Sequence, residues 1–170
     1  METRRTRIVN DPSDLVPLLQ SFGSQRHRKL FELLASGWKS EEELEKTAGP
    51  EFKRSLEVLR RGGLLESKWR PPENGRTPDR EYHSSYATIR ANFQCSLEDV
   101  ADLVQVMLLR EEEVEQMAAK VLGEIKEGPK SLSTVCRDLG MNPTFIKGLA
   151  HRSSRFVIKG HRVEPLNHHD

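Results

Sequence analysis

The most informative stretch of the chain, residues 49–65, reads GPEFKRSLEVLRRGGLL. Gly49 followed by Pro50 indicates a turn and then a helix start, because proline in the first turn of a helix leaves no intrahelical hydrogen bond unmade. Apolar residues recur at helical spacing after it, which predicts a helix with one inward face, and Gly62 and Gly63 end that helix. The other faces carry mostly lysine and arginine. The stretch is therefore either a DNA recognition helix or an ordinary amphipathic surface helix.

The residues before this stretch predict further helices. A helix is expected from about residue 24 to residue 36, with Leu30 and Leu34 among its inward residues. Ser40 and Glu43 have the spacing of a capping box, which predicts the start of a second helix that ends at Gly49. Two helices joined by a tight turn, with another helix before them, are typical of a helix-turn-helix.

A hairpin is expected to follow. Residues 64–69 predict a strand, residues 70–79 predict a loop rich in proline with an Asn-Gly pair, and residues 80–89 predict a returning strand. Three helices and then a hairpin with a long tip make a winged helix, in which the hairpin is the wing.

The predicted wing carries arginine and aromatic residues. Trp69, Arg70, Arg76 and Arg80 lie where a wing grips the DNA backbone or a minor groove. Trp69 and Tyr82 have a second interpretation, in which they pack the hairpin onto the helices.

Residues 53–67, KRSLEVLRRGGLLES, resemble the recognition-helix signature of the ArsR-type winged-helix regulators. In that signature an arginine precedes His-Leu-x-x-Leu, and Gly-Leu and a strand follow. The matching residues are Arg54, Leu56, Leu59, Gly63, Leu64 and Glu66, whereas Ser55 stands where the family often has histidine. The resemblance covers about residues 24–90. It implies a prokaryotic, homodimeric DNA-binding repressor or activator.

Metal-sensing members of that family carry a cysteine-rich motif on the helix before the turn. Here that region, residues 41–48, reads EEELEKTA and has neither cysteine nor histidine. A thiolate metal site in this helix is therefore excluded, and we expect no metal and no other cofactor.

The candidate contacts to double-stranded DNA lie on the recognition helix and the wing. The residues expected to read base edges are near the helix start and are Lys53, Arg54 and Ser55. The residues expected to contact phosphates are Arg60, Arg61, Arg70, Arg76 and Arg80.

Residues 97–127 predict helical structure, with an apolar stripe from Val100 to Ile125 that Arg110 and three glutamates interrupt. The segment forms either one long helix or two consecutive helices. Its apolar face either pairs with a second chain or covers the first domain, and dimerisation is the interpretation we adopt.

The last forty residues predict two more short helices and a hairpin that turns at Gly160. Together with the helix before them, they resemble a second, smaller winged helix. Their cations give this part a basic edge, which touches either DNA or protein; they are Lys147, Arg152, Arg155, Lys159 and Arg162.

Composition limits the other classes of function. The net charge of the 170 residues is only +1, and an acidic segment, residues 97–130, separates two mildly basic parts. Two cysteines, Cys95 and Cys136, are too few for a disulfide framework and are expected to be packing residues. No apolar run is long enough to cross a membrane and no phosphate loop or nucleophile motif occurs, so we expect a soluble, cytoplasmic protein that is not an enzyme.

These observations predict a mainly α fold with small β-hairpins (α+β) that contains two tandem winged helices. The expected divisions are residues 1–96 as the DNA-binding domain, 97–127 as a helical linker and dimerisation segment, and 128–170 as the second winged helix. The expected function is a dimeric DNA-binding transcriptional regulator. The alternatives are a winged-helix scaffold for protein interactions and, on the basic edges alone, an RNA-binding module.

Overall fold

The computed structural model describes residues 4–71 and 78–166. The chain divides into two compact units, one formed by residues 1–9 and 17–92 and the other by residues 10–16 and 93–170. The polypeptide therefore passes between the units three times.

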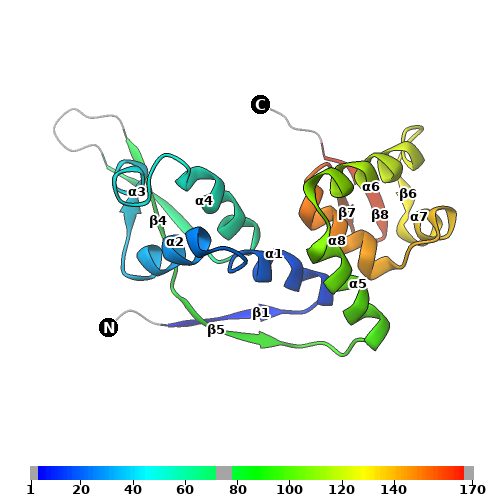
Figure 1. Ribbon diagram of the computed structural model, residues 1–170, viewed down its shortest axis with the longest axis horizontal. Coiled ribbons are helices and arrows are strands. Elements are labelled where there is room, and N and C mark those ends of the chain that lie inside the picture. The colour runs from blue at the N-terminus through cyan, green and yellow to red at the C-terminus, as the bar shows by residue number, and fades with distance from the viewer. Residues whose placement is uncertain (1–3, 72–77, 167–170) are drawn as a thin grey trace. The chain divides into compact units, whose positions relative to one another are not determined.

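The first unit holds a helix-turn-helix and two small sheets (Figure 1). Its elements are β1 (Arg5–Val9), α2 (Gln25–Ala35), β2 (Lys39–Ser40), α3 (Glu41–Ala48), α4 (Phe52–Arg61), β3 (Glu66–Arg70), β4 (Asp79–His83) and β5 (Tyr86–Ala91). Helix α1 (Leu15–Gln20) contains the passage from the second unit to the first.

The local signals in the sequence place these helices. The Ser40 hydroxyl accepts a hydrogen bond from the Glu43 amide at 3.2 Å, and the Glu43 carboxylate accepts one from the Ser40 amide at 2.8 Å, so the predicted capping box is confirmed. The Ser24 hydroxyl caps α2 by accepting a hydrogen bond from the His27 amide at 3.2 Å. The core of the unit forms where the apolar faces of the three helices meet, and its most buried side chains include Leu30, Leu34, Leu44, Phe52 and Leu59.

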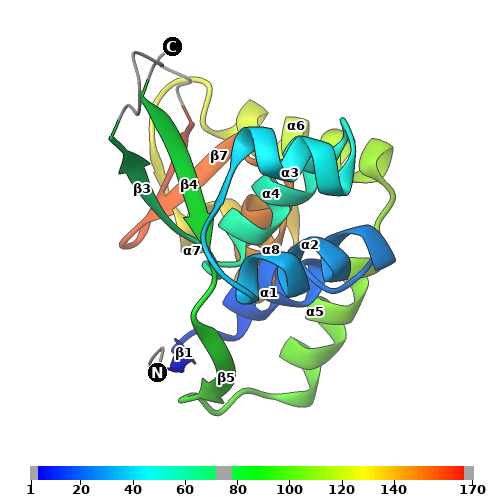
Figure 2. The ribbon, with the colours of Figure 1, turned by 90° about the vertical axis from the view of Figure 1, so that its left-hand side faces the viewer.

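The wing is shorter than predicted. Strands β2, β4 and β3 form an antiparallel sheet in that order, but the expected returning strand over residues 80–89 is wrong as a single element. The wing strand β4 ends at His83, and the Ser84 amide donates a hydrogen bond to the Leu34 carbonyl at 3.2 Å. The chain then leaves the wing and forms β5 beside β1, as Figure 2 shows.

The parallel pair of β1 and β5 was not predicted. The hydroxyls of Thr6 and Thr88 are hydrogen-bonded across it at 2.8 Å. The Arg5 guanidinium forms an ion pair with Glu66 of β3 at 2.5 Å, so the N-terminal strand is tied to the base of the wing.

Part of the second unit repeats an order found in the first from α2 to β4: a helix, a short strand, two helices and two strands. Its elements are a 3₁₀ helix η1 (Pro12–Asp14), α5 (Leu97–Leu108), α6 (Glu111–Glu124), β6 (Lys130–Ser131), α7 (Leu132–Leu139), α8 (Pro143–Ser153), β7 (Phe156–Lys159) and β8 (Arg162–Pro165). The sheet order β6-β8-β7 repeats the order β2-β4-β3 of the first unit. The core of this unit includes Val114, Ala118, Val121, Val135, Ile146, Leu149 and Phe156.

Residues 97–127 form two consecutive helices and belong to the second unit. Helix α5 ends at Leu108, and α6 begins after Arg110, whose amide donates a hydrogen bond to the Glu113 carboxylate at 2.8 Å. Leu103 and Val106 of α5 are buried against Phe145 of α8. The inward face of these helices therefore packs within the second unit.

Candidate nucleic-acid interface

Helix α4 is fixed in the first unit by one apolar face. Phe52, Leu56 and Leu59 are buried, as their spacing predicted. The helix ends at the two glycines, and Gly63 has a φ of +67°, a conformation that side chains other than glycine adopt at a cost. A Cβ atom at Gly63 would also lie 2.9 Å from the Arg7 guanidinium. The positive φ favours glycine here, whereas the flexible end of the Arg7 side chain could shift to admit a Cβ atom.

The opposite face of α4 is exposed and cationic. Arg54 and Arg61 lie opposite the buried residues, and Lys53 and Arg60 lie on an exposed flank of the same helix. Glu57 pairs with Arg60 at 2.7 Å and with Arg61 at 3.4 Å. Exposed pairs of this kind contribute little energy, so phosphate oxygens can compete for both arginines.

Three of the candidate residues come together in a groove between α4 and the wing. Lys53 and Arg60 approach it from the helix, and Arg80 approaches it from β4. The groove has a volume of about 170 Å³, and Leu56 and Tyr82 form part of its floor. Glu57 and Glu66 also line this groove, and we name it the basic groove after its three cations.

The aromatic residues of the wing have different roles. Trp69 is 63% exposed, and the Arg80 guanidinium lies 4.8 Å from the centre of its ring, so Trp69 is not part of the packing. Tyr82 is buried, and its hydroxyl donates a hydrogen bond to Glu41 at 3.0 Å. Burial is the larger cause that raises the pKa of Tyr82, and the hydrogen bond to the negatively charged Glu41 raises it further. The packing interpretation is therefore confirmed for Tyr82 and wrong for Trp69.

Arg70 is held within the wing sheet. Its guanidinium forms an ion pair with Glu81 at 2.7 Å, and Lys68 lies 3.6 Å from the same carboxylate. The Glu81 side chain is only 7% exposed, so it needs these partners. We therefore assign Arg70 mainly to neutralising Glu81. Arg76, the remaining candidate on the wing, lies outside the described residues.

Ser55 is not placed to read a base. Its side chain is buried, and its hydroxyl shares a hydrogen bond of 2.8 Å with Nδ1 of His27 on α2. The residue falls on the inward side of α4 with Phe52 and Leu59, three and four positions away. Burial, and then the charge of Arg54, lower the pKa of His27. Ser55 and His27 thus support the start of α4, a role that the sequence did not indicate.

The basic edge expected on the second unit is largely neutralised. Lys147 pairs with Asp11 at 2.7 Å, Arg155 with Glu115 at 3.0 Å and Lys159 with Glu164 at 3.1 Å.

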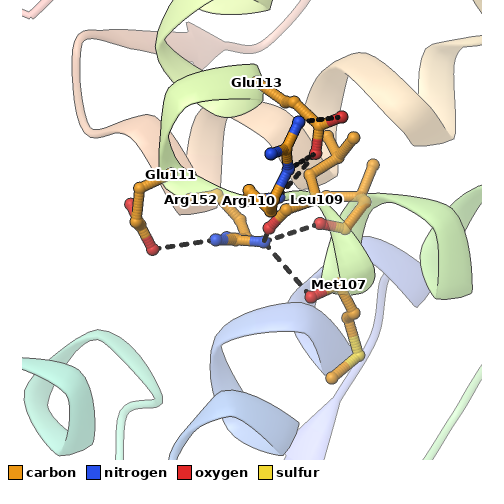
Figure 3. Close-up of polar contacts among 7 residues, drawn as sticks. Met107, Leu109, Arg110, Glu111, Glu113 and Arg152 are labelled. Carbon is orange, nitrogen blue, oxygen red and sulfur yellow. Dashed lines mark hydrogen bonds and ion pairs between the residues drawn. The ribbon is translucent and has the colours of Figure 1, made fainter.

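Arg152 is a structural residue of this unit, with a side chain only 5% exposed. Its Nη1 donates hydrogen bonds to the carbonyl oxygens of Val106 at 2.9 Å, Met107 at 3.2 Å and Leu109 at 2.7 Å. Its Nη2 pairs with Glu111 at 2.9 Å (Figure 3). These carbonyls end α5 and have no partner within the helix, so Arg152 holds the break between α5 and α6.

The described side chains also bear on three other features: a metal site, a reactive cysteine and a membrane-spanning helix. Within residues 4–71 and 78–166, no three His, Cys, Asp or Glu side chains gather as metal ligands would. Cys136 is buried, and burial raises the pKa of its thiol, which disfavours the reactive thiolate. Among the described helices, none combines the length and the apolar character needed to cross a membrane.

Comparisons with known proteins give one finding about the family. No curated protein matches the chain. The model of the ArsR transcriptional regulator family matches residues 9–167, a range that includes α4, the wing and the whole second unit apart from its last residues. The chain therefore belongs to the ArsR family of transcriptional regulators.

Proposed function

We propose that the protein is a cytoplasmic regulator that binds double-stranded DNA as a homodimer, with α4 in the major groove and the wing on the backbone. The observation that carries this proposal is the basic groove, in which Lys53 and Arg60 of α4 and Arg80 of the wing converge beside an exposed helix face. Cations from two elements at one groove suit the phosphate backbone, which supplies most of the sequence-independent binding energy.

Within this proposal Lys53 and Arg54 contact base edges. Both lie in the first turn of α4, the part of a recognition helix that reaches the bases. Arg60, Arg61 and Arg80 contact phosphates.

The dimer is supported by an exposed apolar stripe on α5. Leu97, Val100, Val104 and Leu108 follow one another at intervals of three or four residues, so they lie on one side of the helix. They are 88%, 43%, 51% and 77% exposed, which is unusual for four neighbouring large apolar side chains. A second copy of α5 would bury this stripe, and the resulting dimer would carry two α4 helices.

A protein-interaction role is the second candidate, and we propose it for the second unit. Its repeated element order supports a second winged helix, but four of the five residues of its basic edge are paired with carboxylates of the same unit, and Arg162 alone among those five has no such pair among the described side chains. A winged helix with so few unpaired cations on this edge is better suited to contacting protein than DNA.

Titration of the purified protein against random duplex DNA at two salt concentrations tests the proposal, with the mass in solution recorded alongside. Salt-sensitive binding by a dimer is the expected result. No binding at low salt, by a protein that circular dichroism shows to be folded, would contradict DNA binding and favour the scaffold. A monomeric mass would contradict the dimer alone.

A further inference from the structure

A second groove lies on the first unit, on the side of α4 that packs against α2. It has a volume of about 790 Å³ and is bounded by α2, the end of α3 and the start of α4. Small-molecule sites typically measure about 300–1,000 Å³ and are lined by apolar side chains with a few polar groups. The walls here fit that description, since they include Leu30, Leu33, Ala48, Pro50 and Phe52. None of the cations of the basic groove lines it.

The rim of this groove is cationic. Arg26 and Lys29 line it from one side of α2, and Glu51 is the one acidic residue among the described residues that line it. Glu51 already forms an ion pair with Arg26. Lys29 has no carboxylate within ion-pair distance among the described side chains. An apolar groove with an uncompensated cation at its edge is complementary to a ligand with an apolar body and one negative charge.

We propose that this groove binds a small organic acid with an apolar body, and that this acid is the effector of the regulator. The apolar part lies against Leu33, Ala48 and Pro50, and the acid group lies at Lys29 and Arg26. The effector role, though not the binding site, rests on the proposed DNA-binding function.

The groove is connected to the DNA-reading end of α4 through shared residues. Pro50, Glu51 and Phe52, which line it, directly precede Lys53 and Arg54. An acid group at Arg26 competes for the guanidinium with Glu51, the residue at the N-terminal cap of α4. A ligand that favours one arrangement of this turn must change DNA affinity, and DNA must change ligand affinity by the same factor.

The binding site is tested without DNA. The intact protein is titrated with the fluorescent acid 1-anilinonaphthalene-8-sulfonate, and the dye is then displaced with decanoate, decanol or decyltrimethylammonium. Because a hydrogen bond to a charged group adds to the shared apolar contact, decanoate should displace the dye at about one-tenth the concentration of decanol. Equal potency of the three compounds would overturn the proposal.

Two variants assign the binding to this groove. Ala48→Trp fills it, and Lys29→Gln removes the cation at its rim. The first should abolish displaceable dye binding, and the second should bring decanoate and decanol to equal potency. Lys46→Gln, at an exposed lysine that pairs with Glu42 outside the groove, should change neither result.

Leu108→Gln controls for dye bound to the exposed stripe of α5 and should also leave decanoate displacement unchanged. Circular dichroism establishes that each variant is folded, and Lys29→Gln provides the test if Ala48→Trp does not fold. Decanoate displacement that survives both groove variants would overturn the site.

The effector role is tested by fluorescence anisotropy of a labelled duplex. Saturating decanoate should weaken DNA binding by about fivefold or more in the wild type and not in Lys29→Gln. Unchanged DNA affinity in a protein that binds decanoate would overturn the effector role. Decanoate binding in a protein that binds no DNA would instead contradict the proposed function and leave the site intact.

Discussion

Replacing Arg80 by glutamine should weaken binding to every DNA duplex alike and reduce the salt dependence of binding. Arg80 lies on β4 opposite Trp69 of β3, and its guanidinium rests 4.8 Å from the centre of that ring. The stacking holds the charge at the basic groove beside Lys53 and Arg60. Glutamine keeps a polar side chain of comparable reach and removes the charge.

The magnitude follows from the release of counterions from DNA. The logarithm of the binding constant falls with the logarithm of salt concentration by about 0.9 for each phosphate that the protein neutralises. Loss of one contact should reduce this slope by about 0.9. Between about 50 and about 200 mM salt, the wild type should therefore lose about 3.5 times more affinity than the variant loses.

Anisotropy titrations of a labelled duplex at four salt concentrations measure the slope. Arg137→Gln is the matched control, because Arg137 is an exposed arginine of α7 that pairs with its neighbour Asp138. A slope in Arg80→Gln equal to that of the wild type would refute the phosphate contact. A loss confined to one DNA sequence would assign Arg80 to base reading instead.

Three further predictions concern single residues. Arg54→Ala should relax sequence preference by about 1–3 kcal/mol if it reads a guanine, and equal loss on specific and random DNA would refute that role. Arg152→Met should lower the free energy of unfolding, measured in urea, by about 1–3 kcal/mol, because the carbonyls at the end of α5 lose their hydrogen-bond donor. A free energy of unfolding equal to that of the wild type would show that water replaces the guanidinium as donor. Burial alone would raise the pKa of Asp11, but hydrogen bonds from Lys147 and Ser13 outweigh burial, so the pKa is lowered. The ionised Asp11 therefore stabilises the folded protein above about pH 4. This contribution is lost as the pH falls through the folded-state pKa. The stability difference between wild type and Asp11→Asn should accordingly shrink in acid, and a constant difference in urea unfolding from pH 7 to pH 3 would contradict this account.

Local signals were sufficient to predict the helix-turn-helix. The spacing of Phe52, Leu56 and Leu59, the capping box at Ser40 and the glycines after α4 each act within a few residues of chain. The parallel pairing of β1 with β5 joins residues about eighty positions apart and depends on the folded first unit. No periodic pattern near the N-terminus indicates it.

The candidate site was predicted less completely than the fold, because sequence shows where charges are and not which partners they have. Arg70 and Arg80 look equivalent in the sequence, yet Arg70 neutralises the buried Glu81 and Arg80 stacks on an exposed tryptophan. Ser55 follows Arg54 directly, but the turn of the helix buries its hydroxyl against His27. Only the packing of neighbouring elements distinguishes these roles.

Selection of bound duplexes from a random-sequence pool, at about physiological salt, tests the central claim most directly. The account predicts enrichment of a palindrome whose half-sites lie about one helical turn, or roughly 34 Å, apart, because two α4 helices of a dimer would enter successive major grooves. The Arg54→Ala protein should enrich a more degenerate site. A pool that remains random after repeated selection with folded protein would contradict sequence-specific recognition by α4.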